Sequence, residues 1–341
     1  MKITTKEVRT AVRLLDEIIK EYKEEHPSKK RNWKTYEHQH AERVATAFRE
    51  LKPFAQKAVA SLQTTRSSER GRKRKLSLEQ KVLVLLLKHL VKKSNRDMAH
   101  MLILFSLLTD VSVSYKSIER LYSDHEVQLA IHNLHMLILQ KKNITTTDSS
   151  GDGTGYAISV RQHYSSEAQK LKQAIKKSSQ QRKQSKRRKY IYSFEIIDLK
   201  SRLYLGCGTS FKSEKEAFLK ATDMVQQTRI TMKSLRLDRY YSGQTTITFC
   251  RNKFENTKVY LIPKKNATIK GSWEWKRMLH AFLHTTKPYL QEYYKRNQSE
   301  SAFSEDKRRT GWTIAQRKVE RVDTANTLTM LWHNLYWLAP S

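Results

Sequence analysis

The hydrophobic pattern of this chain changes its period near residue 140, and this change constrains the fold more than any other feature. Before it, apolar residues recur at spacings of three and four behind helix-start signals such as Thr4-x-x-Glu7 and Ser77-x-x-Gln80. After it, β-branched and aromatic residues alternate, and turn residues separate the short runs. The sequence therefore predicts an all-α region that precedes an α/β region, a mixed sheet flanked by helices.

The expected elements follow this pattern along the chain. Helices are expected at residues 5–24, 33–50, 77–91, 98–108, 114–122 and 213–227, and again from Gly271 onward. Strands are expected at 144–147, 235–237 and 259–262, and a β-hairpin at 190–206 with its turn near Lys200. Three regions result: a basic helical region with a linker at 1–75, a helical region at 76–140, and the α/β region at 141–341.

The charge balance is the second constraint. Lys and Arg number 66 against 33 Asp and Glu, which gives a formal net charge of +33. Nucleic acid is the usual partner of such a chain, because each cation near a phosphate releases condensed counterions. Residues 66–75 and 161–189 are strongly basic, and we expect DNA to order the second stretch. A surface tuned for solubility, or one that binds acidic membranes, is the alternative.

The remaining composition excludes several classes of protein. The longest apolar run, Val82 to Leu87, is far shorter than the ~20 residues that span a bilayer. The N-terminus lacks an apolar signal-peptide core, and two cysteines, Cys207 and Cys250, cannot form a disulfide scaffold or a Cys-rich zinc site. We therefore expect a cytoplasmic protein without a membrane partner.

The segment 98–122 has the outline of a helix-turn-helix. An apolar helix is followed by a short break at 109–112 and by a brief polar helix that carries Tyr115, Lys116 and Arg120. These three residues are the candidates for DNA contacts in the helical region. An ordinary helical bundle whose last helix is polar would give the same pattern, because the turn has no diagnostic glycine.

Three carboxylates stand out by their context. Asp148 and Asp238 each end a predicted strand, where α/β sheets place their ligand sites. Glu300 lies in a predicted helix, where spacings of three, four and seven place it on one face with Tyr293, Arg296 and Lys307. Three converging carboxylates suit Mg²⁺ or Mn²⁺, and the flanking cations would hold a phosphate backbone. Taken singly, an Asp after a strand is also a common turn residue, and such a helix face is commonly solvated.

These residues resemble a known family. The signature Tyr293-(2)-Arg296-(3)-Glu300-(6)-Lys307 is similar to the Tyr-(2)-Arg-(3)-Glu-(6)-Lys signature of one branch of the DDE transposases from prokaryotic insertion sequences. Asp148-Ser-Ser-Gly resembles the first-aspartate motif of that branch, and Asp238-Arg-Tyr-Tyr-Ser-Gly resembles the second.

The resemblance implies a cut-and-paste transposase with an RNase H-like catalytic domain. Asp148, Asp238 and Glu300 would then bind two Mg²⁺ or Mn²⁺ ions, and Tyr293, Arg296 and Lys307 would contact DNA phosphates. The helical region would recognise the inverted repeats at the ends of the element, a homodimer would pair two ends, and the protein would work at the prokaryotic nucleoid. A transposase-derived, sequence-specific DNA-binding protein without catalytic activity is the alternative.

Some features depart from the resemblance or compete with it. The interval from Asp238 to Glu300 is too short for the long insertion from which some relatives stack a tryptophan on a flipped base; Trp273 and Trp275 lie in this interval. Rival acids rank lower: Asp152 could replace Asp148 but lies one turn past the expected strand end, Asp198 lies at the hairpin tip, where a turn favours Asp, and Glu305 and Asp306 lie off the face of Arg296 and Lys307. The pairs His280/His284 and His132/His135 lack the partners of a zinc site.

Overall fold

The computed structural model describes residues 3–25, 27, 32–62, 75–92, 95–109, 113–158 and 190–339, with the backbone alone for 103–109. The basic stretch 161–189 and almost all of 66–75 lie outside this part. Within the described ranges, no helix is long and apolar enough to cross a membrane.

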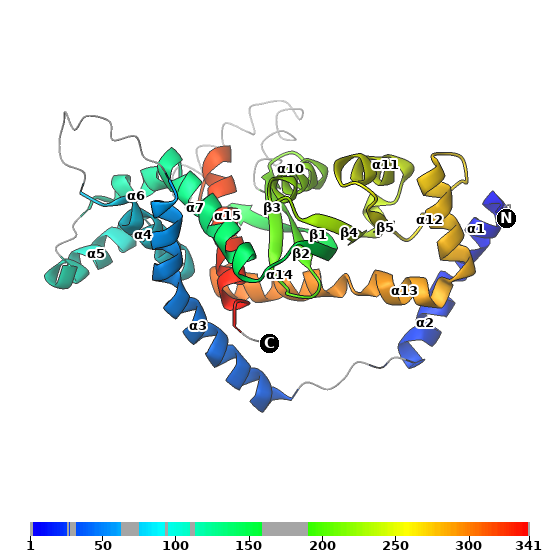
Figure 1. Ribbon diagram of the computed structural model, residues 1–341, viewed down its shortest axis with the longest axis horizontal. Coiled ribbons are helices and arrows are strands. Elements are labelled where there is room, and N and C mark those ends of the chain that lie inside the picture. Colours follow the sequence, from blue (N-terminus) through cyan, green and yellow to red (C-terminus); the bar gives the residue numbers. More distant parts are fainter. Residues whose placement is uncertain are drawn as a thin grey trace, which may run out of the picture.

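A mixed β-sheet forms the centre of the molecule (Figure 1). Its strands are β1 (Thr146–Ile158), β2 (Tyr190–Asp198), β3 (Tyr204–Ser210), β4 (Thr231–Arg236), β5 (Lys258–Tyr260) and β6 (Thr313–Ile314). The order is β3-β2-β1-β4-β5, with β6 paired to β1. The pairs β1–β2 and β2–β3 are antiparallel, whereas β4 and β6 run parallel to β1, and β5 runs parallel to β4. The predicted α/β class, an RNase H-like mixed sheet flanked by helices, is confirmed.

The hairpin β2–β3 has its turn where the sequence predicts it. Asp198 ends β2, and its buried carboxylate accepts hydrogen bonds from the backbone N–H of Ser201 and from Thr147 Oγ1, both at 2.6 Å. Arg202 takes a positive φ of 61° in the same turn. The structural role predicted for Asp198 is therefore confirmed.

Helices cover the two faces of the sheet. On one face, α10 (Glu214–Gln227) packs so closely that a Cβ atom on Gly208 would lie 2.3 Å from the carbonyl oxygen of Ala217. On the other face, α14 (Asn297–Thr310) lies against β1, where Ser299 Oγ is 2.7 Å from Ser150 Oγ. Because alternate residues of a strand point to opposite faces, the even-numbered residues of β1 face α14.

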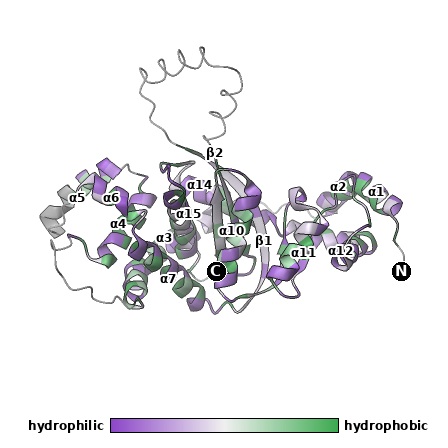
Figure 2. Cartoon of the chain, turned by 90° about the horizontal axis from the view of Figure 1, so that it is seen from above, coloured by the Kyte–Doolittle hydropathy of each residue, from purple (hydrophilic) through white to green (hydrophobic). Residues whose placement is uncertain are grey.

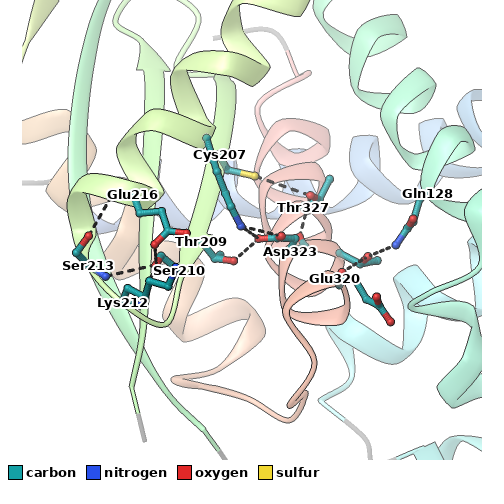
Figure 3. Close-up of polar contacts among 12 residues, drawn as sticks. Gln128, Cys207, Thr209, Ser210, Lys212, Ser213, Glu216, Glu320, Asp323 and Thr327 are labelled. Carbon is teal, nitrogen blue, oxygen red and sulfur yellow. Dashed lines mark hydrogen bonds and ion pairs between the residues drawn. The ribbon is translucent and has the colours of Figure 1, made fainter. Parts of the chain in front are cut away.

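The C-terminal helix α15 (Val319–Tyr336) joins the sheet to the helical region. That region contains α3 (Trp33–Ala60), α4 (Leu78–Leu90), α5 (Asn95–Thr109), α6 (Tyr115–Leu121) and α7 (His125–Lys141). Toward the helices, Trp332 Nε1 donates to the carbonyl of Leu86 at 3.0 Å. Toward the sheet, the Asp323 carboxylate accepts from Thr209, as Figure 3 shows, and it also pairs with Lys220 of α10.

The helices of residues 1–75 lie apart from one another, on opposite sides of the sheet (Figures 1 and 2). α1 (Thr5–Arg13) and α2 (Leu15–Glu25) pack against α12 (Trp273–His284) and α13 (Thr286–Tyr294), where Lys287 pairs with Glu25 at 2.7 Å. By contrast, α3 packs against α7 and α15. The capping box of Thr4 and Glu7 is confirmed. The single helix at 5–24 is wrong, since the chain breaks at Leu14, and so is the interruption at Pro53, which α3 includes.

Candidate active site

Asp238 lies two residues past the end of β4, so it follows a strand as the sequence predicts. It is the N-cap of a single 3-10 turn, η2 (Arg239–Tyr241), and its carboxylate accepts a hydrogen bond from the N–H of Tyr240 at 3.3 Å. The side chain is 39% exposed, so it can meet a ligand at this end of the strand. The helix α11 (Gln244–Lys253) begins shortly after the turn.

The strand β1 is longer than the sequence predicts, and its length changes which acid lies beside Asp238. The prediction of a strand that ends at Asp148 is wrong, because β1 runs on to Ile158 in pairs with β2 and β6. In the parallel register of β1 and β4, Ser150 lies opposite Arg236. Two residues further along, Asp152 reaches the level of Asp238, which follows β4 by two residues.

Asp148 lies elsewhere on the strand. It pairs with Ser234 in the register of β1 and β4, and its carboxylate accepts a hydrogen bond from Ser234 Oγ. Four residues of extended chain separate it from Asp152, a distance of about 13 Å. The structure therefore brings Asp152, and not Asp148, to Asp238. Asp152 appears in the sequence as a rival acid, and only the pairing of β1 identifies its place.

Arg296 joins the three acids of this site. Its Nη1 lies 3.5 Å from Oδ2 of Asp152, and its Nη2 lies 3.4 Å from Oδ1 of Asp238 and 2.8 Å from Oε1 of Glu300. These acids come from β1, from the end of β4 and from the first turn of α14. We refer to Asp152, Asp238, Glu300 and Arg296 as the acidic cluster.

The helix that carries Glu300 is interrupted. The sequence predicts one helix face with Tyr293, Arg296, Glu300 and Lys307, but α13 ends at Tyr294 and α14 begins at Asn297. Lys295 and Arg296 form the connecting turn, and both keep right-handed helical dihedral angles. The prediction of a single helix is wrong, although Arg296 and Glu300 still meet.

The electrostatics of the cluster follow from burial and from crowding of like charges. The pKa of the Asp152 carboxyl is raised to about 6. Burial is the main cause and the nearby charges of Asp238 and Glu300 add to the rise, whereas Arg296 and the hydrogen bond from the N–H of Gly153 oppose it. Arg296 Nη1 is buried and has no hydrogen-bond partner, although it faces Asp152 as an ion pair. The site thus concentrates negative charge that one guanidinium group balances only in part.

Tyr293 and Lys307 flank the cluster in different ways. The ring of Tyr293 is buried and lies 5.6 Å from the guanidinium carbon of Arg296, and burial raises the pKa of its hydroxyl to about 12. Lys307 points to the far part of β1, where its Nζ donates to Thr154 Oγ1 at 2.6 Å. The Nζ also lies 5.0 Å from the ring of the exposed Trp312. Lys307 therefore lies two residues along the strand from Asp152.

The candidate DNA contacts of the helical region lie on the surface of α6, and the two candidate tryptophans differ in exposure. Tyr115, Lys116 and Arg120 are exposed on α6, which buries Ile118 and Leu121, and Arg96 lies over the ring of Tyr115 at 5.3 Å. Trp275 is buried and donates to the carbonyl of Thr268 at 2.7 Å, whereas Trp273 is exposed.

Of the remaining acids and histidines, Asp306 and His135 are buried and hydrogen-bonded. Asp306 accepts from Tyr204 and pairs with His333, and the His135 ring meets the carbonyl of Leu205. Among the described residues, no three His, Cys, Asp or Glu side chains already form a metal-ligand group.

Comparisons with known proteins identify the family. No family model matches the chain, and no solved structure matches it. The chain is 37% identical over 339 residues to a protein of Archaeoglobus fulgidus that is described as "Probable transposase for insertion sequence element ISA1214". The match covers 98% of this chain and 97% of that protein, so the likeness extends over the sheet and over the helical region. The chain therefore belongs to the family of insertion-sequence transposases.

Proposed function

We propose that this transposase cleaves DNA at the ends of an insertion sequence, and joins the freed ends to target DNA, with Asp152, Asp238 and Glu300 as its catalytic carboxylates. The observation that carries the proposal is the convergence of three acids, from three separate elements, on the guanidinium of Arg296 within 3.5 Å. Asp152 takes the place that the resemblance gave to Asp148, because Asp148 is bonded to Ser234 further back on β1.

The donor set of the cluster fits Mg²⁺ or Mn²⁺. Carboxylate oxygens are the ligands that these ions prefer, and three carboxylates around one guanidinium leave negative charge that a cation would balance. Asp152, Asp238 and Glu300 would hold the metal, with two ions as the proposed number. Bound there, divalent cations supply the charge that activates an attacking oxygen and stabilises a leaving oxygen in phosphodiester chemistry.

The neighbouring residues would place the DNA strand against these carboxylates. Lys307 lies beside Trp312 on the side of Asp152, and Tyr293 lies under Arg296. We assign to Lys307 and Arg296 the contacts to the phosphates around the scissile bond, since cations position DNA through its backbone, and to the buried Tyr293 the support of Arg296 from beneath. These contacts would orient the scissile phosphate in line with the attacking oxygen.

Recognition of the DNA ends belongs, in this proposal, to the helical region at 76–140. The exposed side chains of Tyr115, Lys116 and Arg120 on α6 form a polar surface above a buried apolar side, as in a helix that enters the major groove. The basic stretch 66–75 would contribute further contacts, and residues 141–341 would form the catalytic domain. Two copies would pair two ends as a homodimer in the cytoplasm, at the nucleoid.

Cleavage of a duplex that carries the terminal repeats of the element tests the proposal. In Mg²⁺ or Mn²⁺ we expect strand cleavage by the unmodified protein, and loss of about a thousandfold or more for Asp238→Asn and Glu300→Gln. With EDTA in place of the metal, binding of the same duplex should weaken by no more than about twofold, because these changes leave the phosphate contacts in place. Duplex binding without any nicking by the unmodified protein would instead favour the transposase-derived DNA-binding protein.

A further inference from the structure

The guanidinium of Arg296 lies where it neutralises the whole acidic cluster. Its side chain is 15% exposed and extends from the turn between α13 and α14 toward the three acids. The guanidinium is therefore mostly covered by protein. In the described part of the chain, the ion pairs of Asp152, Asp238 and Glu300 all go to this one group. The cluster thus has three acids and a single cation at contact distance.

Two of the contacts between Arg296 and the three acids are long enough for another cation to replace the guanidinium. Only the contact to Glu300, at 2.8 Å, has the length of a charge-assisted hydrogen bond, whereas those to Asp152 and Asp238 are 3.5 and 3.4 Å. Nη1 makes no hydrogen bond at all although it is buried. A guanidinium held firmly by carboxylates forms short paired hydrogen bonds to them, and this one is instead shared among three groups.

A divalent cation would compete with Arg296 for the same oxygens. Metal ions bring more charge to the site than one guanidinium, and hard cations bind carboxylate oxygens directly. Once displaced, the long side chain of Arg296 would lie beside the site with its five N–H donors unpaired. Phosphate oxygens of a bound DNA strand match that planar group, since arginine binds phosphate by paired hydrogen bonds.

From this geometry we infer that Arg296 is an internal counter-cation that couples metal binding to DNA binding: metal displaces the guanidinium from the acids, and the guanidinium then takes a DNA phosphate. The inference rests on the proposed function of the acidic cluster. Because coupling between two ligands is reciprocal, DNA must raise the metal affinity by the factor by which metal raises the DNA affinity.

The metal affinity of the DNA-free protein tests this inference without any activity measurement. Free Mn²⁺ is followed by electron paramagnetic resonance for the unmodified chain, for Arg296→Gln and for Arg308→Gln. Arg308 is the matched control, because it is exposed on the same helix α14 and hydrogen-bonds to Ser304 rather than to the cluster. We expect Arg296→Gln to bind Mn²⁺ at least about fivefold more tightly, with Arg308→Gln within about twofold of the unmodified protein.

The coupling itself is measured with a fluorescent duplex of the terminal repeat and with Ca²⁺, which binds carboxylates in place of Mg²⁺. The unmodified protein and Arg308→Gln should bind the duplex at least about fivefold more tightly when Ca²⁺ is present, and Arg296→Gln should lose this gain. Arg296→Lys should keep part of it, since lysine retains the charge but not the paired hydrogen bonds.

Two outcomes overturn different statements. If Mn²⁺ binds and Asp238→Asn abolishes the binding, but Arg296→Gln leaves the affinity unchanged or weaker, the counter-cation role is wrong and the metal site stands. If Mn²⁺ binds to none of the proteins, or if Asp238→Asn does not reduce its binding, the metal site of the proposed function is wrong, and the coupling falls with it. Thermal unfolding of each variant shows whether it is folded.

Discussion

Asp152, within β1, and Asp238, just past the end of β4, both lie within 3.5 Å of the guanidinium group of Arg296. Because β1 and β4 are parallel neighbours, the two carboxylates reach the same level of the sheet, although they are far apart in the sequence. Glu300 completes the cluster from α14, which covers this face of the sheet. The expected effects of substitutions follow from this arrangement.

The two aspartates of β1 should differ sharply in their effect on cleavage. Asp152→Asn should reduce strand cleavage by about a thousandfold or more, because it removes a carboxylate of the cluster. Asp148→Asn should stay within about tenfold of the unmodified protein, since an amide oxygen can still accept the hydrogen bond from Ser234 Oγ. Cleavage rates on a duplex of the terminal repeat measure both. If Asp148→Asn reduced cleavage far more than Asp152→Asn, then Asp148, and not Asp152, would be the first catalytic carboxylate.

Asp306 should be needed for stability rather than for chemistry. Its buried carboxylate accepts from the Tyr204 hydroxyl at 2.7 Å, and it pairs with Arg309 at 2.9 Å and with His333 at 3.0 Å. Asp306→Ala leaves these partners buried without their acceptor, so the free energy of unfolding should fall by about 3–5 kcal/mol. Urea unfolding measures this change. Glu305→Ala, at the adjacent and less buried position, should stay within about 0.5 kcal/mol of the unmodified protein.

Glu195 should make the stability depend on pH. It lies opposite Asp152 in the pairing of β1 with β2, and burial raises the pKa of its carboxyl to about 8. The folded protein therefore binds a proton that the unfolded chain releases near its ordinary pKa of 4.5. This contribution to stability is fully present below that value, falls as the pH rises and is lost above pH about 8.

The variant Glu195→Gln isolates this effect, because an amide stays neutral and its oxygen can still accept from Ser193 and Asn326. We expect it to unfold at nearly the same temperature as the unmodified protein at acidic pH. At pH values above 8 it should be more stable by a few kcal/mol, on the order of 1.4 per pH unit of the shift. An equal loss of melting temperature in both proteins between these conditions would show that Glu195 is not the titrating group.

Binding of the terminal repeats should depend on α6 and on salt. The double change Lys116→Ala with Arg120→Ala should weaken binding and make the slope of log affinity against log salt shallower by about 2, one for each lost phosphate contact. Lys20→Ala with Lys23→Ala is the matched control, because it removes the same charge from the exposed side of α2 at the other end of the molecule. If the two double variants have equal slopes, then α6 is not part of the DNA interface.

Local patterns predicted the elements that depend on neighbouring residues. The capping residues Thr4, Ser77 and Ser213 begin α1, α4 and α10, because each hydroxyl accepts from an N–H three residues along the chain. Alternating apolar residues predicted the β2–β3 hairpin, and the position of Asp238 after a strand is as expected. The mixed sheet, the preceding helices and a DNA partner followed from period and charge, and the family supports the transposase function.

The identity of the first carboxylate required the tertiary structure. Asp148-Ser-Ser-Gly has the composition of a turn, yet β1 continues through it because β2 pairs with Ser149 through Ala157. The glycines of this segment leave room for neighbouring side chains: a Cβ atom on Gly155 would overlap the Tyr190 hydroxyl, and one on Gly153 would overlap the Glu214 carboxylate. Cross-strand pairing overrode the local preference for a turn, as is common for β-structure.

The break between α13 and α14 and the separate positions of α2 and α3 likewise appear only in the tertiary structure. The sequence alone determined where the capped helices α1, α4 and α10 begin, which residues carry charge, and that Asp238 follows a strand, since these depend on residues a few positions apart. Only the folded chain decided how far β1 extends and which acids meet at Arg296, because strand pairing joins residues that are distant in the sequence.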